Sequence, residues 1–447
     1  MDGIPTPRRY VAILALAIGT AVSVVDGGIA NVALPTMARS LGISPSLAVL
    51  VVTVYQLALV TTLLPLAALG QRIGLRRLYQ AGQLIFVVAS LLCFFARSLP
   101  FLLVVRVAQG LGAAATISVS SALIRAVYPA RQLGRGLSVN TLVVSISSVV
   151  APSLGGLIIS HATWPWLFAA AVPLGVLSLI LGRAALPDVP RQTDPYDVTS
   201  ALFCVLTFGL LIGGLESLVH GESPVIAWAI VIVGVGIAVM FVRRELAAEQ
   251  PILPVDMLRQ PVLALSVMGA FLAFVAAMCL MLSLPFRLQQ TMGFLPSEVG
   301  AMIMPWPAAI MLVVPLTGFL ADRYPAAVLG GIGMAIAVVG FLLLATLPAD
   351  ATHLSVVWRM ALCGAGYGLY LTPNARLIVS SAPLARAASA GGLIASNRLF
   401  GQTVGATVVA ALLDGGHGAD RTPALLAAVM AFAACICSLA RTSRKFR

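Results

Sequence analysis

The sequence predicts an all-α protein that crosses a membrane fourteen times, as two six-helix bundles with a two-helix hairpin inserted between them. Composition is the first observation behind this fold class, because 60% of the 447 residues are hydrophobic and only 9% are charged. A soluble domain carries about 25% charged residues, so this composition is typical of a polytopic membrane protein. The other two observations are the spacing of the apolar segments and a repeat between the two ends of the chain.

Fourteen apolar segments are separated by short polar stretches, and each can cross a hydrocarbon layer roughly 30 Å thick. Their approximate bounds are 10–33, 48–70, 77–96, 99–124, 137–160, 164–186, 198–219, 225–242, 261–285, 297–320, 326–347, 354–375, 389–413 and 422–440. The first follows Arg8 and Arg9 as a signal peptide would. It is longer than an apolar signal core, so we expect it to be retained.

Basic residues are distributed unequally between the two sides that these segments define. One side has few of them: Arg39, Arg97, Arg287 and Arg421. Three lie within apolar segments: Arg106, Arg359 and Arg398. The rest of the 27 basic residues lie on the side of the two termini, which the positive-inside rule assigns to the cytoplasm. The net charge of +12 therefore indicates membrane topology and not a nucleic-acid-binding surface.

The two ends of the chain also share motifs. The stretch 67–72, after the second apolar segment, resembles 318–323, after the tenth. Arg106 and Arg359 open the fourth and twelfth segments, and each is followed by a pair of glycines. Similar offsets at two separate landmarks predict parallel repeats, the plan of transporters whose site lies between two halves. The predicted division is an N-terminal bundle, a central hairpin with its linkers, and a C-terminal bundle, at 1–190, 191–250 and 251–447.

Asp26 is a single carboxylate deep in the first apolar segment, where a charged group costs a few kcal/mol or more. Such residues are usually functional, and burial allows an acid to bind and release protons near neutral pH. Arg106 is a permanent cation about seven residues into the fourth segment. We expect Asp26 and Arg106 to serve proton coupling. The alternatives are an Asp satisfied only structurally and an Arg that extends to the membrane surface.

A second group of residues is predicted to control conformational change. Some belong to short polar loops or to the stretches beside them, and others to a bent segment of small residues that allows close helix packing. The members are Arg72, Gly74, Arg76, Pro152, Gly155, Gly156, Gly318, Asp322 and Arg323.

Polar and aromatic side chains within the apolar segments are candidates for the substrate cavity, although aromatic residues in such segments usually serve packing. The candidates are Asn31, Tyr55, Gln56, Gln109, Asn140, Trp306, Tyr367, Tyr370, Asn397 and Arg398. Arg398 is too deep in its segment to be read as a surface residue. Glu216 and Asp414 lie near segment ends and are more typical of helix interfaces than of proton relays.

Nothing in the sequence predicts an enzyme or a cofactor. It contains no phosphate-binding loop, no metal-ligand cluster and no nucleophile constellation. The six cysteines fall inside apolar segments and are interpreted as packing residues, and the four histidines fall in predicted outward loops.

At these motifs the chain resembles the major facilitator superfamily, and more narrowly its fourteen-span drug:proton antiporter branch. The stretch 26–35 is similar to that branch's first-span motif, which implies that Asp26 couples protons. The stretches 106–112 and 136–156 are similar to its fourth- and fifth-span motifs, the latter typical of exporters. Three positions depart from the pattern: Ala67 and Ala151 replace glycines, and Gln71 replaces an acid.

The sequence thus predicts a proton-coupled antiporter of a bacterial inner membrane, which exports small amphipathic, cationic or neutral compounds by alternating access. Because Asp26 is the one deep acid, monovalent or neutral substrates are favoured over dications. The expected partners are the substrate, protons and the lipid bilayer, and the protein is expected to act as a monomer. The alternatives are a facilitator or uptake carrier for a small metabolite and, less favoured, a lipid scramblase.

Overall fold

The computed structural model describes residues 3–129, 133–191, 196–219, 223–248, 255–321, 323–348, 350–381 and 387–442. In these residues all regular structure is helical, which confirms the predicted all-α class. The N-terminal part contains α1 (Arg8–Leu41), α2 (Pro45–Ile73), α3 (Leu75–Phe94), α4 (Leu99–Val127), α5 (Leu133–His161), α6 (Trp166–Ala169) and α7 (Ala171–Ala185). The central hairpin is α8 (Val198–Val219) and α9 (Pro224–Ala247).

The C-terminal part begins with η2 (Val255–Arg259), a short 3₁₀ helix. It continues with α10 (Pro261–Phe286), η3 (Arg287–Thr291), α11 (Pro296–Ile303), α12 (Pro305–Ala321), α13 (Ala326–Ala345), α14 (His353–Ser380), α15 (Ala387–Asp414) and α16 (Thr422–Ala440). Thirteen helical segments among the described residues are long and apolar enough to cross a membrane. The fourteenth predicted segment is α15, a helix of 28 residues that contains more polar side chains.

Local sequence explains where the first helices begin and end. Gly42 ends α1 in the left-handed conformation, at φ 65°, where its N–H bonds to the carbonyls of Ala38 and Arg39. Ser44 then caps α2 by accepting a hydrogen bond from the N–H of Leu47 at 3.3 Å. Gly74, at φ 107°, makes the short break between α2 and α3.

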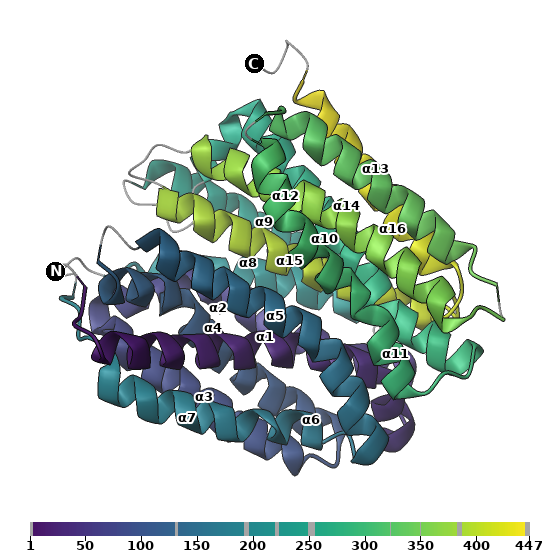
Figure 1. Ribbon diagram of the computed structural model, residues 1–447, viewed down its shortest axis with the longest axis horizontal. Helices are drawn as coiled ribbons and strands as arrows, with labels where there is room; N and C mark the ends of the chain where they lie inside the picture. The colour runs from purple at the N-terminus through teal and green to yellow at the C-terminus, as the bar shows by residue number, and fades with distance from the viewer. Residues whose placement is uncertain are drawn as a thin grey trace.

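The helices form two bundles, α1 to α7 and α10 to α16, which lie in the lower and upper parts of Figure 1. In the first bundle α1 packs against α5 and α7, and α4 packs against α2 and α3. In the second, α14 packs against α12 and α13, and α10 packs against α15 and α16. Each apolar helix therefore buries one face within its own bundle.

The two ends of the molecule differ. We call the end where α1 begins and α16 finishes the terminal end, and the opposite one the far end. At the far end the bundles touch: the Gln289 side chain donates to the Val32 carbonyl at 2.9 Å, and the Ser46 hydroxyl donates to Asp414 at 3.4 Å. Towards the terminal end, on the left of Figure 1, the bundles diverge. The structure is therefore closed between its halves at the far end.

Glycines bring α5 and α11 into contact at the far end. A Cβ atom on Gly156 would lie 2.5 Å from the Pro296 carbonyl oxygen, and one on Gly300 would lie 2.5 Å from the Pro152 carbonyl oxygen. Gly155 packs in the same way against the Ile29 carbonyl of α1. These backbone contacts cannot accommodate larger side chains, so small residues are required where the halves meet.

The hairpin lies along the seam between α2 and α15, with α8 in contact with both helices. On the α2 side, the Cys204 thiol donates to the Thr61 carbonyl at 3.8 Å. On the α15 side, the Thr407 hydroxyl donates to Glu216 at 2.5 Å, and the rings of Phe208 and Phe400 lie 5.3 Å apart. The hairpin is thus bonded to both bundles.

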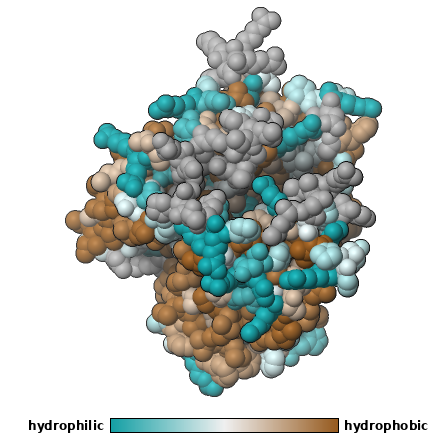
Figure 2. All heavy atoms as spheres, turned by 90° about the vertical axis from the view of Figure 1, so that its left-hand side faces the viewer, coloured by the Kyte–Doolittle hydropathy of each residue, from teal (hydrophilic) through white to brown (hydrophobic). Residues whose placement is uncertain are grey.

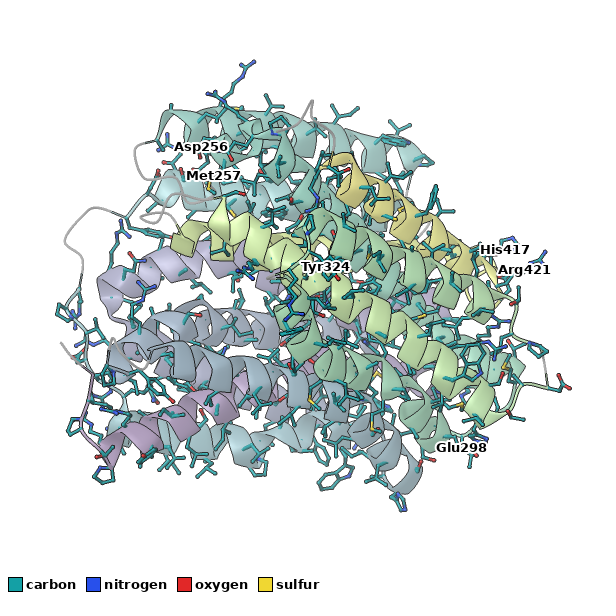
Figure 3. The ribbon with its side chains drawn as sticks, turned by 45° about the horizontal axis from the view of Figure 1, so that its top comes forward. Asp256, Met257, Glu298, Tyr324, His417 and Arg421 are labelled. Carbon is teal, nitrogen blue, oxygen red and sulfur yellow. The ribbon has the colours of Figure 1, made fainter. Side chains whose placement is uncertain are left out.

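The surface is divided as expected of a protein that spans a membrane. Figure 2 views the terminal end, where hydrophilic side chains spread across the middle of the view and brown, hydrophobic flanks lie beside and below them. Exposed apolar side chains cover the flanks, among them Val225 of α9 at 78% and Leu312 of α12 at 73%. Polar residues mark the two ends in Figure 3, with Asp256 of η2 at one and Glu298 of α11, His417 and Arg421 at the other.

Replacing Gly156 by Val is expected to open the far end, because the new side chain meets the Pro296 carbonyl. The readout is labelling of Ser297→Cys, on α11, with a membrane-impermeant maleimide. We expect labelling to increase several-fold. Gly213→Val in α8 is the matched control, because nothing lies within 4 Å of a Cβ atom there. Equal labelling of both variants would show that the contact does not close this end.

Candidate functional site

The first-segment acid and the fourth-segment cation meet inside the N-terminal bundle. An Nη1 of Arg106 lies 2.6 Å from Oδ2 of Asp26, and the two residues are 0% and 2% exposed. They are 80 positions apart in the chain, on α4 and α1. A buried pair of this kind is stable only if its geometry is good and its remaining polar atoms are also bonded.

Further hydrogen bonds satisfy the remaining polar atoms of this pair. The Gln109 amide donates to Asp26 Oδ1 at 2.8 Å and to the Ser90 hydroxyl at 2.9 Å. Its carbonyl oxygen accepts from Arg106 at 2.6 Å. The Arg106 Nε donates to the Val51 carbonyl of α2 at 3.0 Å. Asp26, Ser90, Arg106 and Gln109, called the acid cluster below, tie α1, α3 and α4 together, and the bond to Val51 adds α2.

Aromatic rings cover the guanidinium. The Tyr55 ring centroid lies 4.2 Å from Cζ of Arg106, and that of Phe168 lies 5.1 Å away. Both distances allow cation–π attraction, which is stronger where water is excluded. The Tyr55 hydroxyl donates to the Ser23 carbonyl of α1 at 3.2 Å, so the ring is held in place.

The acid cluster is bonded within the N-terminal bundle. Asp26 points towards α4, whereas the next two residues of α1 face other helices: Gly27 lies beside the Tyr55 ring, and Gly28 lies beside Ala151 of α5. Protonation of Asp26 would leave Arg106 without its counterion inside the bundle. A proton at this carboxylate therefore changes the forces between α1, α2 and α4.

Other predicted cavity residues of the N-terminal half lie on several helices. Asn31 is half-buried, and its Oδ1 makes no hydrogen bond with a described residue. Asn140 is also half-buried, and it accepts a hydrogen bond from Thr20 at 3.5 Å. Gln56 is 6% exposed, and its Oε1 is buried without a partner among the described residues.

Three aromatic candidates pack inside the C-terminal bundle. The Trp306 ring lies 4.7 Å from that of Tyr367 and 5.8 Å from that of Phe341. The Tyr367 hydroxyl donates to the Ala273 carbonyl, and Tyr370 is fully buried. Their contacts are those of a packed core, so their role in binding substrate remains a prediction.

The candidates on α15 are placed differently. Asn397 donates to the Val267 carbonyl of α10 at 3.0 Å, which ties α15 to α10. Arg398 is half-buried, and its Nε makes no hydrogen bond with any described residue.

The predicted conformational residues bond mainly within their own halves. Arg72 donates to the Ala68 carbonyl at 2.9 Å, and Arg76 donates to the Arg183 carbonyl of α7 at 2.5 Å. Gln71 is exposed. Arg323 lies over the Phe319 ring at 4.2 Å. Gly318 belongs to α12, whereas Asp322 lies outside the described residues.

Sequence reasoning missed some members of the buried polar sites. Ser90 and Phe168 were not singled out, because a serine and a phenylalanine are ordinary in apolar segments. The sequence places Arg441 only among the basic residues on the side of the termini, but it is 5% exposed and donates to Ser266 at 2.8 Å and to Asn374 at 2.6 Å. Its position just after the last apolar segment conceals this burial.

Comparison with known proteins identifies the family. The model of the Major Facilitator Superfamily matches residues 16–406. The chain belongs to this superfamily. It is therefore a multi-pass membrane transporter and not an enzyme.

Two relatives match most of the chain. The chain is 42% identical to the uncharacterized transporter YebQ of Escherichia coli K12, over 100% of this chain and 98% of that protein. It is 30% identical to the multidrug resistance protein Stp of Mycobacterium tuberculosis, over 94% and 79% of the two chains.

A solved structure supports the fold alone. A bacterial homologue of the human lysosomal transporter Spinster, in an inward-facing and unoccupied conformation, matches with a TM-score of 0.68. The match covers 99% of each chain at 18% identity.

Replacing Arg106 by Leu is expected to destabilise the protein by about 3–5 kcal/mol, because it leaves Asp26 buried without a counterion. The double variant Asp26→Leu/Arg106→Leu should recover much of this loss, since no charge then remains in the acid cluster. Thermal unfolding of purified protein in detergent measures both. Additive losses in the double variant would show that the two residues do not form an energetic pair.

Proposed function

We propose that this transporter is a proton-coupled antiporter that exports small amphipathic compounds across a bacterial inner membrane by alternating access. The observation that carries the proposal is the fully buried Asp26–Arg106 pair with its bond at 2.6 Å. In the proposed arrangement both termini are cytoplasmic and the protein acts as a monomer.

Asp26 is proposed as the group that carries the proton. While it is ionised, it attracts Arg106 and accepts a hydrogen bond from Gln109, which holds α1 against α4. Protonation removes most of that attraction and leaves a buried cation that must find other partners. The Val51 carbonyl and the Tyr55 ring of α2 are already in contact with the guanidinium. The proton thereby biases the packing of α1 and α4 on α2.

Coupling then follows from linkage between two sites on the same molecule. If the protonated form favours one conformation and the substrate favours the other, each ligand promotes release of its counterpart. Because the partners of Asp26 belong to the N-terminal bundle, its effect on substrate passes through helix positions. Direct competition for the carboxylate is not needed.

Two features support the direction of transport. The fifth-helix stretch around Pro152, Gly155 and Gly156 is similar to the exporter motif and lies where the halves meet at the far end. The relative from Mycobacterium tuberculosis is described as a multidrug resistance protein. Both favour export over uptake.

Asp26→Asn is expected to abolish uphill export, because an amide cannot carry a proton through the cycle. The assay uses inside-out vesicles that are acidic inside and a panel of cationic, neutral and anionic aromatic compounds. Proton release on addition of a substrate is followed with a pH-sensitive dye. Asp188→Asn, at an exposed acid between α7 and α8, is the matched control.

The same assay separates the alternatives. A facilitator moves substrate down its gradient equally well in wild type and Asp26→Asn, without proton release. An uptake carrier accumulates substrate in the opposite direction. A lipid scramblase equilibrates fluorescent lipid between leaflets with no pH gradient. Retained uphill export by Asp26→Asn would refute the role of this acid.

A further inference from the structure

Arg106 of α4 and Arg398 of α15 both lie within long apolar helices, and they differ in how their charge is balanced. Arg106 is paired with Asp26. Arg398 makes no hydrogen bond or ion pair with any described residue, and its Nε is fully buried without a partner. A guanidinium remains charged in proteins, so this cation requires a compensating group.

Contacts of α15 show which way Arg398 points. Gly401 and Gly405 lie against α10, Phe400 and Thr407 face α8, and Gly392 lies against Leu64 of α2. Successive residues of a helix are turned by about 100°. Arg398 therefore lies in the sector between α10 and α2, opposite the side covered by α8. That sector faces the space between the two bundles.

Gln56 approaches the same space from the other half. On α2, Ser46 and Leu64 face α15, and Ala58 faces Gly110 of α4. By the same rotation Gln56 lies between the face that meets α15 and the face on which Tyr55 reaches the Ser23 carbonyl of α1, on the inner side of the seam. Its side chain is 6% exposed, and its Oε1 is buried without a partner among the described residues. Because this carbonyl oxygen has no donor to hold it, the amide can turn and present its NH₂ group to a ligand.

We propose that Arg398 and Gln56 form the substrate site and that they bind the oxyanion, such as a carboxylate, of an amphipathic organic anion. The guanidinium can form two parallel charge-assisted hydrogen bonds to a carboxylate, and the Gln56 amide can turn its NH₂ group towards the same oxygen atoms. The proposal rests on the proposed transport function. It differs from the sequence-based expectation of cationic or neutral substrates, which followed from Asp26 as the one deep acid.

The site joins the two halves, because Gln56 belongs to the N-terminal bundle and Arg398 to the C-terminal one. An anion bound to both residues therefore bridges the two bundles.

The test compares three probes that share one aromatic frame: naphthalene-1-acetate, naphthalene-1-acetamide and 1-naphthylmethylammonium. Binding to the purified full-length protein in detergent is measured from the shift in thermal unfolding midpoint as a function of probe concentration. The wild type is expected to bind the carboxylate at least about tenfold more tightly than the amide or the ammonium compound. Arg398→Gln should lose this preference, and Arg398→Lys should retain part of it.

Arg359→Gln is the matched control, because Arg359 also has a buried Nε without a partner but lies near the start of α14, away from this seam. It should bind all three probes as wild type does. Without probe, Arg398→Gln should be at least as stable as wild type, since it removes an uncompensated charge. A lower unfolding midpoint would instead indicate a structural arginine and overturn the proposal.

Equal binding of the three probes by wild type, or an unchanged preference in Arg398→Gln, would also overturn it. Failure of the antiport function gives a different pattern. In that case the carboxylate preference depends on Arg398, but no probe triggers Asp26-dependent proton release in vesicles.

Discussion

The ion pair between Asp26 and Arg106 constrains the N-terminal half more than any other interaction. Two opposite charges are buried at 0% and 2% exposure, so every polar atom around them must have a partner. Gln109, Ser90 and the Val51 carbonyl provide these partners. The consequence is that α1, α2, α3 and α4 cannot shift independently without breaking a bond in an apolar medium. Among the described residues of the other half, the buried Arg441 bonds to the neutral side chains of Ser266 and Asn374.

The constraint also explains where close packing is needed. A Cβ atom on Gly110 would lie 2.7 Å from the Tyr55 carbonyl oxygen, so glycine permits α4 to lie directly against α2. That approach brings Arg106 within reach of both the Val51 carbonyl and the Tyr55 ring. The spacing of Arg106 and Gly110 is thus one geometric requirement, in which the small residue allows the large one to reach its partners.

Much of the fold could be predicted from the sequence, because apolar segment length and loop charge depend on the membrane and not on tertiary contacts. The helix order, the all-α class and the central hairpin follow from them. The direction of each side chain could not be predicted in the same way. Asp26 and Gly27 are adjacent in sequence, but one faces α4 and the other lies beside Tyr55 of α2.

For the same reason, the sequence could nominate Arg398 but could not show whether it had a counterion. Pairing depends on which faces of distant helices meet, and no single segment contains that information. The burial of Arg441 could not be predicted from the sequence either. Its place in a polar stretch suggested exposure, whereas contacts with α10 and α14 bury it.

The position of the hairpin has a mechanical consequence. Because α8 bonds to Thr61 on one half and to Thr407 on the other, it connects α2 and α15 along the line where these two helices meet. At the opposite seam α5 meets α11 through close backbone contacts at small residues, and among the described helices none is inserted there as α8 is between α2 and α15. Relative motion of the halves would then be greatest on the side of α5 and α11 and smallest beside the hairpin. The inserted hairpin would thus fix the axis about which the two halves rotate, along α2 and α15.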